Sequence, residues 1–528
     1  MTGAPDPLRN VSRRLGAAVV AASLVLVLAL SGCSLLDRTT TDTDESTGPV
    51  TDETAAPTAA PVPPDESPVY QQSVSWRRCG TLECASVDVP LDWTDPAGPT
   101  IAISVNRSRA RDASQRIGSL LINPGGPGGS GIDLLESFVD TAGERLLDAY
   151  DIVGFDPRGV ERSTPVACGT DAQIDAFYIT DYSVESQDDL DAAEQRSAEF
   201  AQVCRDSTGP ALENLDTVSA ARDMDVIRAV VGDDVLHYLG YSYGTQLGAT
   251  YAEIYPQRVG RVVLDGAVDI LLEPEELSVQ QAGGFESALT AFIEWCQTQE
   301  DCPLSSDVET ARRQIGTIAE VARDEGYPSG TVTDVNGNLM VYGIVVTLYD
   351  QGTWEYLMYA LEEVMSRDTA RIFYELSNFY LDRDPETGEY LGNSTVAFTA
   401  ISCLDDVSED WTIDDQRQFM RDVTAASPTF GWWFGGSGGC TGWPWAAKQR
   451  VESLDNAKTA ATMLVVGTTN DPATPYTWAV SLADHLGAEL LTWEGEGHTA
   501  YGRSNQCVTD AIDGYLVDGN LPPTGTVC

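Results

Sequence analysis

Three short runs of the chain are apolar at consecutive positions, and they constrain the fold more than any other feature. They are SLLINPGG (119–126), YDIVGFDP (150–157) and VLHYLG (235–240). A strand that is apolar on both faces must be covered on both faces, as in a parallel sheet packed between helices. The segments ASVDVPL (85–91) and IAISVNRS (101–108) predict an opening antiparallel pair. Residues 216–234 predict an intervening helix that Asp216 or Thr217 caps. The fold class is therefore α/β.

Length and charge narrow the classes of function. A chain of 528 residues exceeds one ordinary core, so we expect one large domain with an insertion or two domains that share an interface. The 31 basic and 81 acidic residues give a net charge of −50, and Lys448 and Lys458 are the only lysines. Such a surface excludes nucleic acid as a partner and attracts cationic ligands, such as basic peptides or free amino termini. The alternative is that the acidity only keeps an exported protein soluble.

The N-terminus predicts export. Arg9, Arg13 and Arg14 precede an apolar run from Leu15 to Leu30, and the segment LSGC ends at Cys33. The run is too short to span a bilayer, so residues 1–33 read as a signal peptide whose final cysteine is lipidated, as in bacterial lipoproteins. Residues 34–68 are polar and proline-rich and predict a disordered tether. We expect an extracytoplasmic protein, secreted or held at the membrane only by its lipid, by either the general or the twin-arginine route.

Ten cysteines remain after Cys33, an even number that favours disulfides in an oxidising compartment. Their spacing suggests neighbouring pairs, although sequence does not prove connectivity. The suggested pairs are Cys79 with Cys84, Cys168 with Cys204, Cys296 with Cys302, Cys403 with Cys440, and Cys507 with Cys528. Zinc is the rival interpretation, but the chain has three histidines and no clustered Cys-x-x-Cys array, so no metal site is expected.

Two segments match Gly-x-Ser-x-Gly, and their context separates them. GYSYG at 240–244 follows the buried run VLHYLG and precedes a helical pattern that stops near Pro256. A strand-to-helix turn this tight strains the central residue and exposes its side chain, which makes Ser242 a candidate nucleophile. GGSGG at 435–439 has no strand before it and no helix after it.

A serine hydroxyl needs a base, and only three histidines are available. His237 lies within the strand before Ser242, and His485 lies near the end of a predicted helix, so both have structural interpretations. His498 follows a strand that runs into a glycine-rich loop, and Asp471 follows the apolar run 463–466. The order Ser242, Asp471, His498 is that of the α/β hydrolases.

A glycine cluster supplies the remaining part of such a site. LLINPGGPGGSG places backbone N–H groups just after a buried strand, and Gly126 and Tyr243 are the candidate oxyanion donors. A phosphate-binding loop is the rival interpretation, but the stretch lacks a Gly-Lys-Ser/Thr ending and has prolines where donors would be needed. No cofactor is expected.

Taken with Gly-Gly-Pro-Gly at 125–128, these motifs resemble a known family. DPRG at 156–159, GYSYGT, the Asp471 and His498 segments, AISCLDD and CTGWPW are similar to the secreted bacterial tripeptidyl aminopeptidase-like hydrolases, relatives of the proline iminopeptidases. The resemblance extends from about residue 70 to the C-terminus, and NPGGPG is the form of the tripeptidyl branch. It implies an α/β-hydrolase core at 69–270 and 426–528, with a mainly helical cap at 271–425 inserted after RVVLDG.

The cap segment raises two open questions. TVTDVNGNLMVYG predicts a hairpin that turns at Asn336-Gly337. Aromatic residues of the cap segment and just beyond it could form cap core or line a substrate site; they are Trp354, Tyr356, Tyr359, Phe373, Tyr374, Trp411, Trp432 and Trp433. An exopeptidase also needs an anion for the substrate ammonium, since burying that charge unpaired costs several kcal/mol. Asp405, Asp406 and Asp269 are the candidates, and each could equally be a solvated surface acid.

The sequence therefore predicts a serine exopeptidase that acts on peptides with free amino termini. Ser242 would attack, His498 would accept its proton, and Asp471 would orient the imidazole. An esterase is the nearest alternative because the same triad cleaves esters. A lipoprotein that binds peptides without turnover is the alternative from another class.

Overall fold

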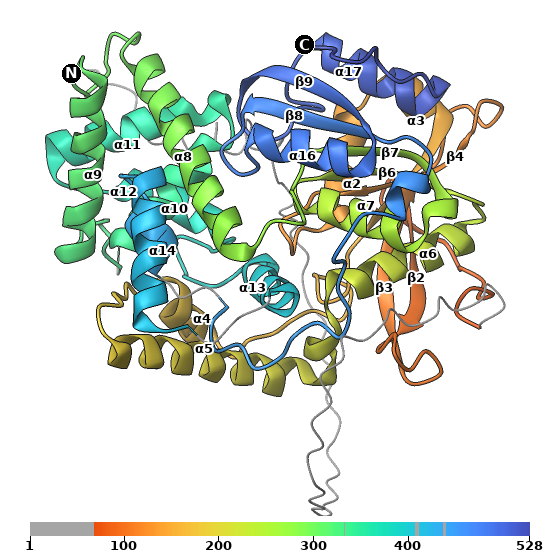
Figure 1. Ribbon diagram of the computed structural model, residues 1–528, viewed down its shortest axis with the longest axis horizontal. Helices are drawn as coiled ribbons and strands as arrows, with labels where there is room; N and C mark the ends of the chain where they lie inside the picture. Colours follow the sequence, from red (N-terminus) through yellow and green to blue (C-terminus); the bar gives the residue numbers. More distant parts are fainter. Residues whose placement is uncertain (1–67, 332, 407–410, 437–439) are drawn as a thin grey trace, which may run out of the picture.

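The computed structural model describes residues 68–331, 333–406, 411–436 and 440–528 of the chain (Figure 1). Within these ranges nine strands form one sheet in the order β1-β2-β3-β5-β4-β6-β7-β8-β9. The strands are β1 (Arg77–Cys79), β2 (Leu82–Pro90), β3 (Thr100–Ser108), β4 (Gly118–Asn123), β5 (Tyr150–Phe155), β6 (Leu236–Tyr241), β7 (Val259–Asp265), β8 (Leu464–Asn470) and β9 (Glu489–Glu496). The signal peptide, Cys33, the tether up to residue 67 and the end of GGSGG lie outside the described residues.

Pairing in the sheet changes once, from antiparallel to parallel. β1, β2, β3 and β5 pair antiparallel, which confirms the predicted opening pair, and every pair from β5–β4 to β8–β9 is parallel. Parallel strands bring their carboxyl ends to one edge, where ligand sites of open α/β sheets form. The segments that follow β4, β6, β7, β8 and β9 therefore meet at that edge.

Helices cover both faces of the sheet, as the apolar runs require. Leu121 and Tyr238 pack against α6 (Thr217–Val231), α7 (Tyr243–Ile254) and α16 (Tyr476–Leu486) on one face. Ile122 and Leu239 pack against α2 (Gly131–Thr141), α3 (Glu144–Ala149) and α17 (Gln506–Asp513) on the other. Successive strand residues enter different cores because their side chains alternate. This is an α/β-hydrolase fold.

A second, helical body stands beside the sheet (Figure 1). It contains α8 (Pro274–Cys296), α9 (Val308–Asp324), α10 (Gly337–Leu348), α11 (Trp354–Arg367), α12 (Arg371–Tyr380), α14 (Ile413–Ala426) and α15 (Gly431–Gly436). Apolar side chains of α8 to α12 form its core. Another core is formed by α4 (Asp171–Tyr178) and α5 (Gln187–Thr208), which follow β5, with α13 (Ser394–Asp405), so a segment after β5 packs with a helix of the cap segment.

The predicted hairpin at Asn336-Gly337 is wrong. Asn336 instead caps α10, because its side chain accepts a hydrogen bond from the Leu339 amide. Among the residues described in this segment, an isolated bridge joins Tyr327 and Val335, and no strand pair forms. Asn-Gly serves a tight turn or a helix cap equally well, and the apolar residues that follow pack into the helical core rather than onto a strand.

All five suggested disulfides are present. They join Cys79 to Cys84, Cys168 to Cys204, Cys296 to Cys302, Cys403 to Cys440 and Cys507 to Cys528. Five disulfides fit a protein exported to an oxidising compartment. Within the described ranges, no helix has the length and apolar character needed to cross a membrane.

Candidate active site

Ser242 occupies the sharp turn between β6 and α7. Its backbone has φ 55° and ψ −125°, a conformation that non-glycine residues rarely adopt. A β-carbon on Gly240 would lie 2.4 Å from the Gly244 carbonyl oxygen, so a side chain at that position would block the turn. The Ser242 amide donates to the Asp265 carbonyl at 2.9 Å, which fixes the turn to the neighbouring strand. The structure thus has the strained strand-to-helix turn that the sequence predicts.

The glycine loop after β4 lies directly against this turn. Gly125, Gly126 and Gly128 have positive φ, and the Gly126-Pro127 peptide is cis. A β-carbon on Gly125 would lie 2.9 Å from Ser242 Cβ and 3.0 Å from the Tyr243 amide nitrogen, so only glycine allows the two segments to approach so closely. Gly126 and Tyr243 both line the cleft that contains Ser242. Their positions fit the proposed pair of oxyanion donors.

The DPRG segment (156–159) supports the glycine loop through Asp156. The Ser130 hydroxyl, which caps α2, donates to Asp156 at 2.5 Å. Asp156 is fully buried and also accepts hydrogen bonds from Arg162, and its burial raises the pKa of the carboxyl. This network fixes the C-terminal end of the glycine loop.

Asp471 and His498 form a buried pair at the same edge of the sheet. His498 Nδ1 lies 2.9 Å and 3.0 Å from the two carboxylate oxygens of Asp471. Asp471 also accepts the Ala473 and Thr474 amides, and the Thr474 hydroxyl lies within hydrogen-bond distance of both members of the pair. Only 3% of Asp471 and 7% of His498 is exposed. This contact leaves Nε2, the other ring nitrogen, available for proton transfer.

The other two histidines have structural positions, as predicted. The His237 ring accepts the Arg261 amide at 3.0 Å and packs edge-on against Tyr150. Burial, with a smaller contribution from the Arg261 charge, lowers its pKa to about 4, so the ring is neutral at pH 7. His485 lies in the last turn of α16.

Ser242 and His498 line one cleft of about 1720 Å³ between the sheet and the helical body. Of the aromatic residues that the sequence singled out, some form the core of the helical body and others line this cleft. Trp354, Tyr356, Phe373 and Tyr374 are core, and Tyr359 packs against it. Trp411, Trp432 and Trp433 line the cleft, which also has the exposed apolar side chains of Phe379, Leu391 and Phe398.

The three candidate anchor carboxylates all line the cleft but differ in their partners. Asp405 accepts the amide and the hydroxyl of Thr217 at 3.0 Å and 2.5 Å, one on each oxygen. Burial and the nearby Asp216 raise its pKa to about 7. Asp406 accepts a hydrogen bond from Arg450 on its backbone oxygen. Asp269 is 5% exposed, and its Oδ1 accepts the Leu271 amide at 3.2 Å.

Glu161 and Asp382 are cleft carboxylates that the sequence did not predict. A β-carbon on Gly392 would lie 2.5 Å from both Glu161 Oε1 and Asp382 Oδ2, so these carboxylates face the same small space. Burial raises the pKa of both. The residues are 221 positions apart, and no local pattern marks either of them as a cleft residue.

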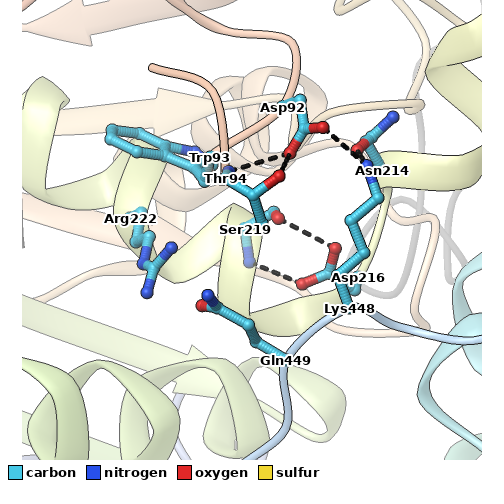
Figure 2. A pocket seen from close by; sticks show the side chains of 9 residues that line it. All are labelled: Asp92, Trp93, Thr94, Asn214, Asp216, Ser219, Arg222, Lys448 and Gln449. Atoms are coloured by element: carbon cyan, nitrogen blue, oxygen red, sulfur yellow. Dashed lines mark hydrogen bonds and ion pairs between the residues drawn. The ribbon is translucent and has the colours of Figure 1, made fainter. Parts of the chain in front are cut away.

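A separate, much smaller pocket lies away from the candidate triad (Figure 2). Lys448 there bonds Asp92 at 2.6 Å and the Asn214 side chain at 2.9 Å. The pocket has about 10 Å³, room for about one water molecule. Its contacts attach the segment before β8 to the opening strands, which is a structural role. Across the described ranges, no group of three or more histidine, cysteine or acidic residues could hold a metal ion.

The fold and the cleft define an α/β hydrolase, and comparisons with known proteins identify the branch. Residues 118–311 match the family model described as alpha/beta hydrolase fold, and residues 428–528 match that of TAP-like proteins. The serine protease Hip1 of Mycobacterium tuberculosis is 34% identical, over 87% of this chain and 92% of the relative. Carboxylesterase B of the same species is 36% identical (91% and 94%), and a tripeptidyl aminopeptidase of Streptomyces lividans is 29% identical (86% and 85%). The chain belongs to the α/β-hydrolase family and is a serine hydrolase of its TAP-like branch.

Proposed function

We propose that this serine hydrolase is an aminopeptidase that releases short peptides from free amino termini, with Ser242, His498 and Asp471 as its catalytic triad. One observation carries the proposal. The buried Asp471–His498 pair opens into the cleft in which Ser242 stands at a strained turn. The mainly apolar cleft offers room for several peptide residues, and its buried carboxylates suit a substrate ammonium.

In the proposed reaction, Ser242 Oγ attacks the scissile carbonyl while His498 Nε2 accepts its proton. Asp471 accepts the Nδ1–H of His498 and stabilises the imidazolium that forms. The Gly126 and Tyr243 amides bind the tetrahedral oxyanion, and the imidazolium then protonates the leaving amine. Water attacks the acyl-enzyme with His498 again as the base, which releases the N-terminal peptide and restores Ser242.

For the ammonium anchor, we favour Asp269 and the pair formed by Glu161 and Asp382 over Asp405. Both oxygens of Asp405 already accept hydrogen bonds, whereas no described residue donates to Asp269 Oδ2 or to the Asp382 carboxylate. A cation between Glu161 and Asp382 would offset the desolvation that raises their pKa values.

The test compares matched peptide p-nitroanilides with free and with acetylated amino termini. We expect the free amine to be preferred, and Ser242→Ala to lower kcat by about 10⁴-fold or more on every substrate. Asp269→Asn, or Glu161→Gln with Asp382→Asn, should raise KM about tenfold or more for the free amine and leave the acetylated substrate unchanged. Equal turnover of both substrates by the unaltered enzyme would refute the exopeptidase assignment. A fluorophosphonate adduct on any residue but Ser242 would refute the nucleophile.

An esterase remains the second candidate because the 36% identical relative is named Carboxylesterase B. The same variants distinguish the two activities. An esterase should hydrolyse short p-nitrophenyl esters much faster than any peptide anilide and should be indifferent to Asp269→Asn. A non-catalytic binding protein should retain its peptide affinity in Ser242→Ala and show no product.

We also propose that Cys33 is lipidated and attaches the protein to the membrane surface. The observation behind this is the apolar run that ends in LSGC. Cys33→Ser should move the protein from the membrane fraction to the medium, and an unchanged distribution would contradict the anchor.

A further inference from the structure

Asp265, the last residue of β7, is in contact with the segments that carry Ser242 and His498. Its backbone carbonyl accepts the Ser242 amide at 2.9 Å. Its carboxylate accepts the Ala500 amide at 3.0 Å and 3.1 Å and the Tyr501 amide at 2.7 Å. One residue therefore bonds the turn of the nucleophile and the loop of the base, which are more than 250 positions apart.

The backbone of the loop that carries His498 is strained on both sides of the histidine. Gly497 and Thr499 both have positive φ, at 105° and 66°, and such a conformation is unfavourable for threonine. The Ala500 and Tyr501 amides are buried, and without Asp265 they would lack acceptors, at a cost of about 1–3 kcal/mol each. The carboxylate therefore selects this conformation of the loop.

Burial of the Asp265 carboxylate lowers the stability of the fold. Its side chain is 0% exposed, and within the described ranges no cation forms an ion pair with it. Burial raises the pKa of the carboxyl to about 6, although the two amides act in the opposite direction. A neutral residue would fill the space at lower cost, so the placement of the carboxylate points to a role in the geometry of the site.

Gly266, the residue after Asp265, lies close to the His498 ring. A β-carbon on Gly266, which has φ +68°, would lie 3.2 Å from His498 Cε1 and 2.8 Å from Thr499 Cγ2. The chain after Asp265 thus packs against the imidazole itself. No hydrogen bond joins Asp265 to the His498 ring, which bonds Asp471 instead.

We propose that Asp265 is a positioning residue for the hydrolytic reaction, and that its carboxylate holds loop 498–501 so that His498 faces Ser242. The inference rests on the proposed function of the Ser242, His498 and Asp471 triad. It differs from the role of Asp471 because Asp265 acts through backbone amides and does not contact the imidazole.

The test is Asp265→Asn, which keeps the shape but replaces one acceptor with a donor. We expect kcat per titrated active site to fall about 10- to 100-fold with KM within about twofold, because a small displacement of the base affects only the transition state. Fluorophosphonate labelling of Ser242 should slow in parallel. Hydrogen exchange should show the Ala500 and Tyr501 amides unprotected while the rest of the sheet stays protected.

Asp513→Asn is the matched control. Asp513 is also a buried carboxylate that contacts this loop, but it accepts the Tyr501 hydroxyl at 2.6 Å and no loop amide. This variant should lose stability and keep its kcat. If Asp265→Asn does not fold, Asp265→Glu keeps the charge and displaces it, and the same loss of kcat is expected.

A folded Asp265 variant with kcat within twofold of the unaltered enzyme would overturn the proposal. Each rate is measured on a p-nitrophenyl ester and on a peptide p-nitroanilide. If the enzyme proves to be an esterase, the rate on the ester still measures the effect of the Asp265 substitution. A failure of the triad itself would appear separately, as undiminished activity of Ser242→Ala.

Discussion

Strained residues gather around the cleft. Six described non-glycine residues have positive φ: Glu161, Thr164, Ser242, Asp368, Asp382 and Thr499. Four of them, Glu161, Ser242, Asp382 and Thr499, line the cleft, although it contains a minority of the chain. Such conformations cost about 1–3 kcal/mol each and persist only where the surroundings enforce them. The packing around the cleft therefore holds these four residues in backbone conformations that they would otherwise leave.

Asp405 makes stability depend on pH. The unfolded carboxyl ionises near its ordinary pKa of 3.8, whereas the folded one keeps its proton up to about pH 7. Stability due to the protonated form is therefore present below about pH 4 and lost as the pH rises to about 7. Asp405→Asn should remove this dependence and gain stability relative to the unaltered protein, by at most about 4 kcal/mol at pH 8.

Urea unfolding at pH 5 and pH 8 measures the effect. Asp301→Asn, at an exposed position, is the control and should show no pH-dependent difference. A stability difference between Asp405→Asn and the unaltered protein that stays constant from pH 5 to pH 8 would show that Asp405 does not titrate in this range.

At the scale of elements, the end of α10 supports the candidate base from the helical body. The Tyr349 carbonyl accepts the His498 amide at 2.9 Å, and its ring meets the imidazole edge-on with centroids 5.4 Å apart. A β-carbon on Gly497 would lie 2.8 Å from the Tyr349 oxygen, so the contact requires glycine. The helical body thus forms one wall of the candidate active site.

Removal of the Tyr349 ring should therefore impair catalysis. We expect Tyr349→Ala to lower kcat about tenfold, since the imidazole loses its packing, and Tyr349→Phe to stay within about twofold. No described residue hydrogen-bonds the Tyr349 hydroxyl, which makes the phenylalanine variant a matched control. Equal effects of the two substitutions would assign the role to the hydroxyl and contradict the packing argument.

At the scale of the whole molecule, the disulfides differ in the length of chain that they close. Cys168–Cys204 spans 36 positions and Cys79–Cys84 spans 5. Chain entropy predicts that Cys168→Ala with Cys204→Ala lowers the free energy of unfolding by about 4 kcal/mol, and the Cys79–Cys84 equivalent by about 2 kcal/mol. Denaturant unfolding of the two double variants checks the ranking, and a larger loss for the shorter loop would contradict it.

Local patterns determined much of this protein. Apolar runs at consecutive positions specified the central strands, because a strand buried on both faces allows no polar alternation. GYSYGT specified the turn at Ser242, because a side chain at position 240 would block it and position 244 is also tightly packed. The order of elements also predicted Asp471 and His498 as partners, since each follows a strand and the carboxyl ends of parallel strands share an edge. Pairing each cysteine with its neighbour in the sequence predicted the five disulfides.

Only the tertiary structure decided which polar groups are partnered. Asp405 looked as suitable for an ammonium as Asp269 until the fold placed Thr217, 188 positions away, on both of its oxygens. Asn336 capped a helix instead of turning a hairpin because the apolar residues beyond it pack into a helical core. Glu161 and Asp382 face one small space, and Asp265 bonds amides of the His498 loop, in an arrangement that no local pattern encodes. Local propensity fixes how each segment folds, whereas the free energy of a buried charge depends on groups that only the complete chain brings to it.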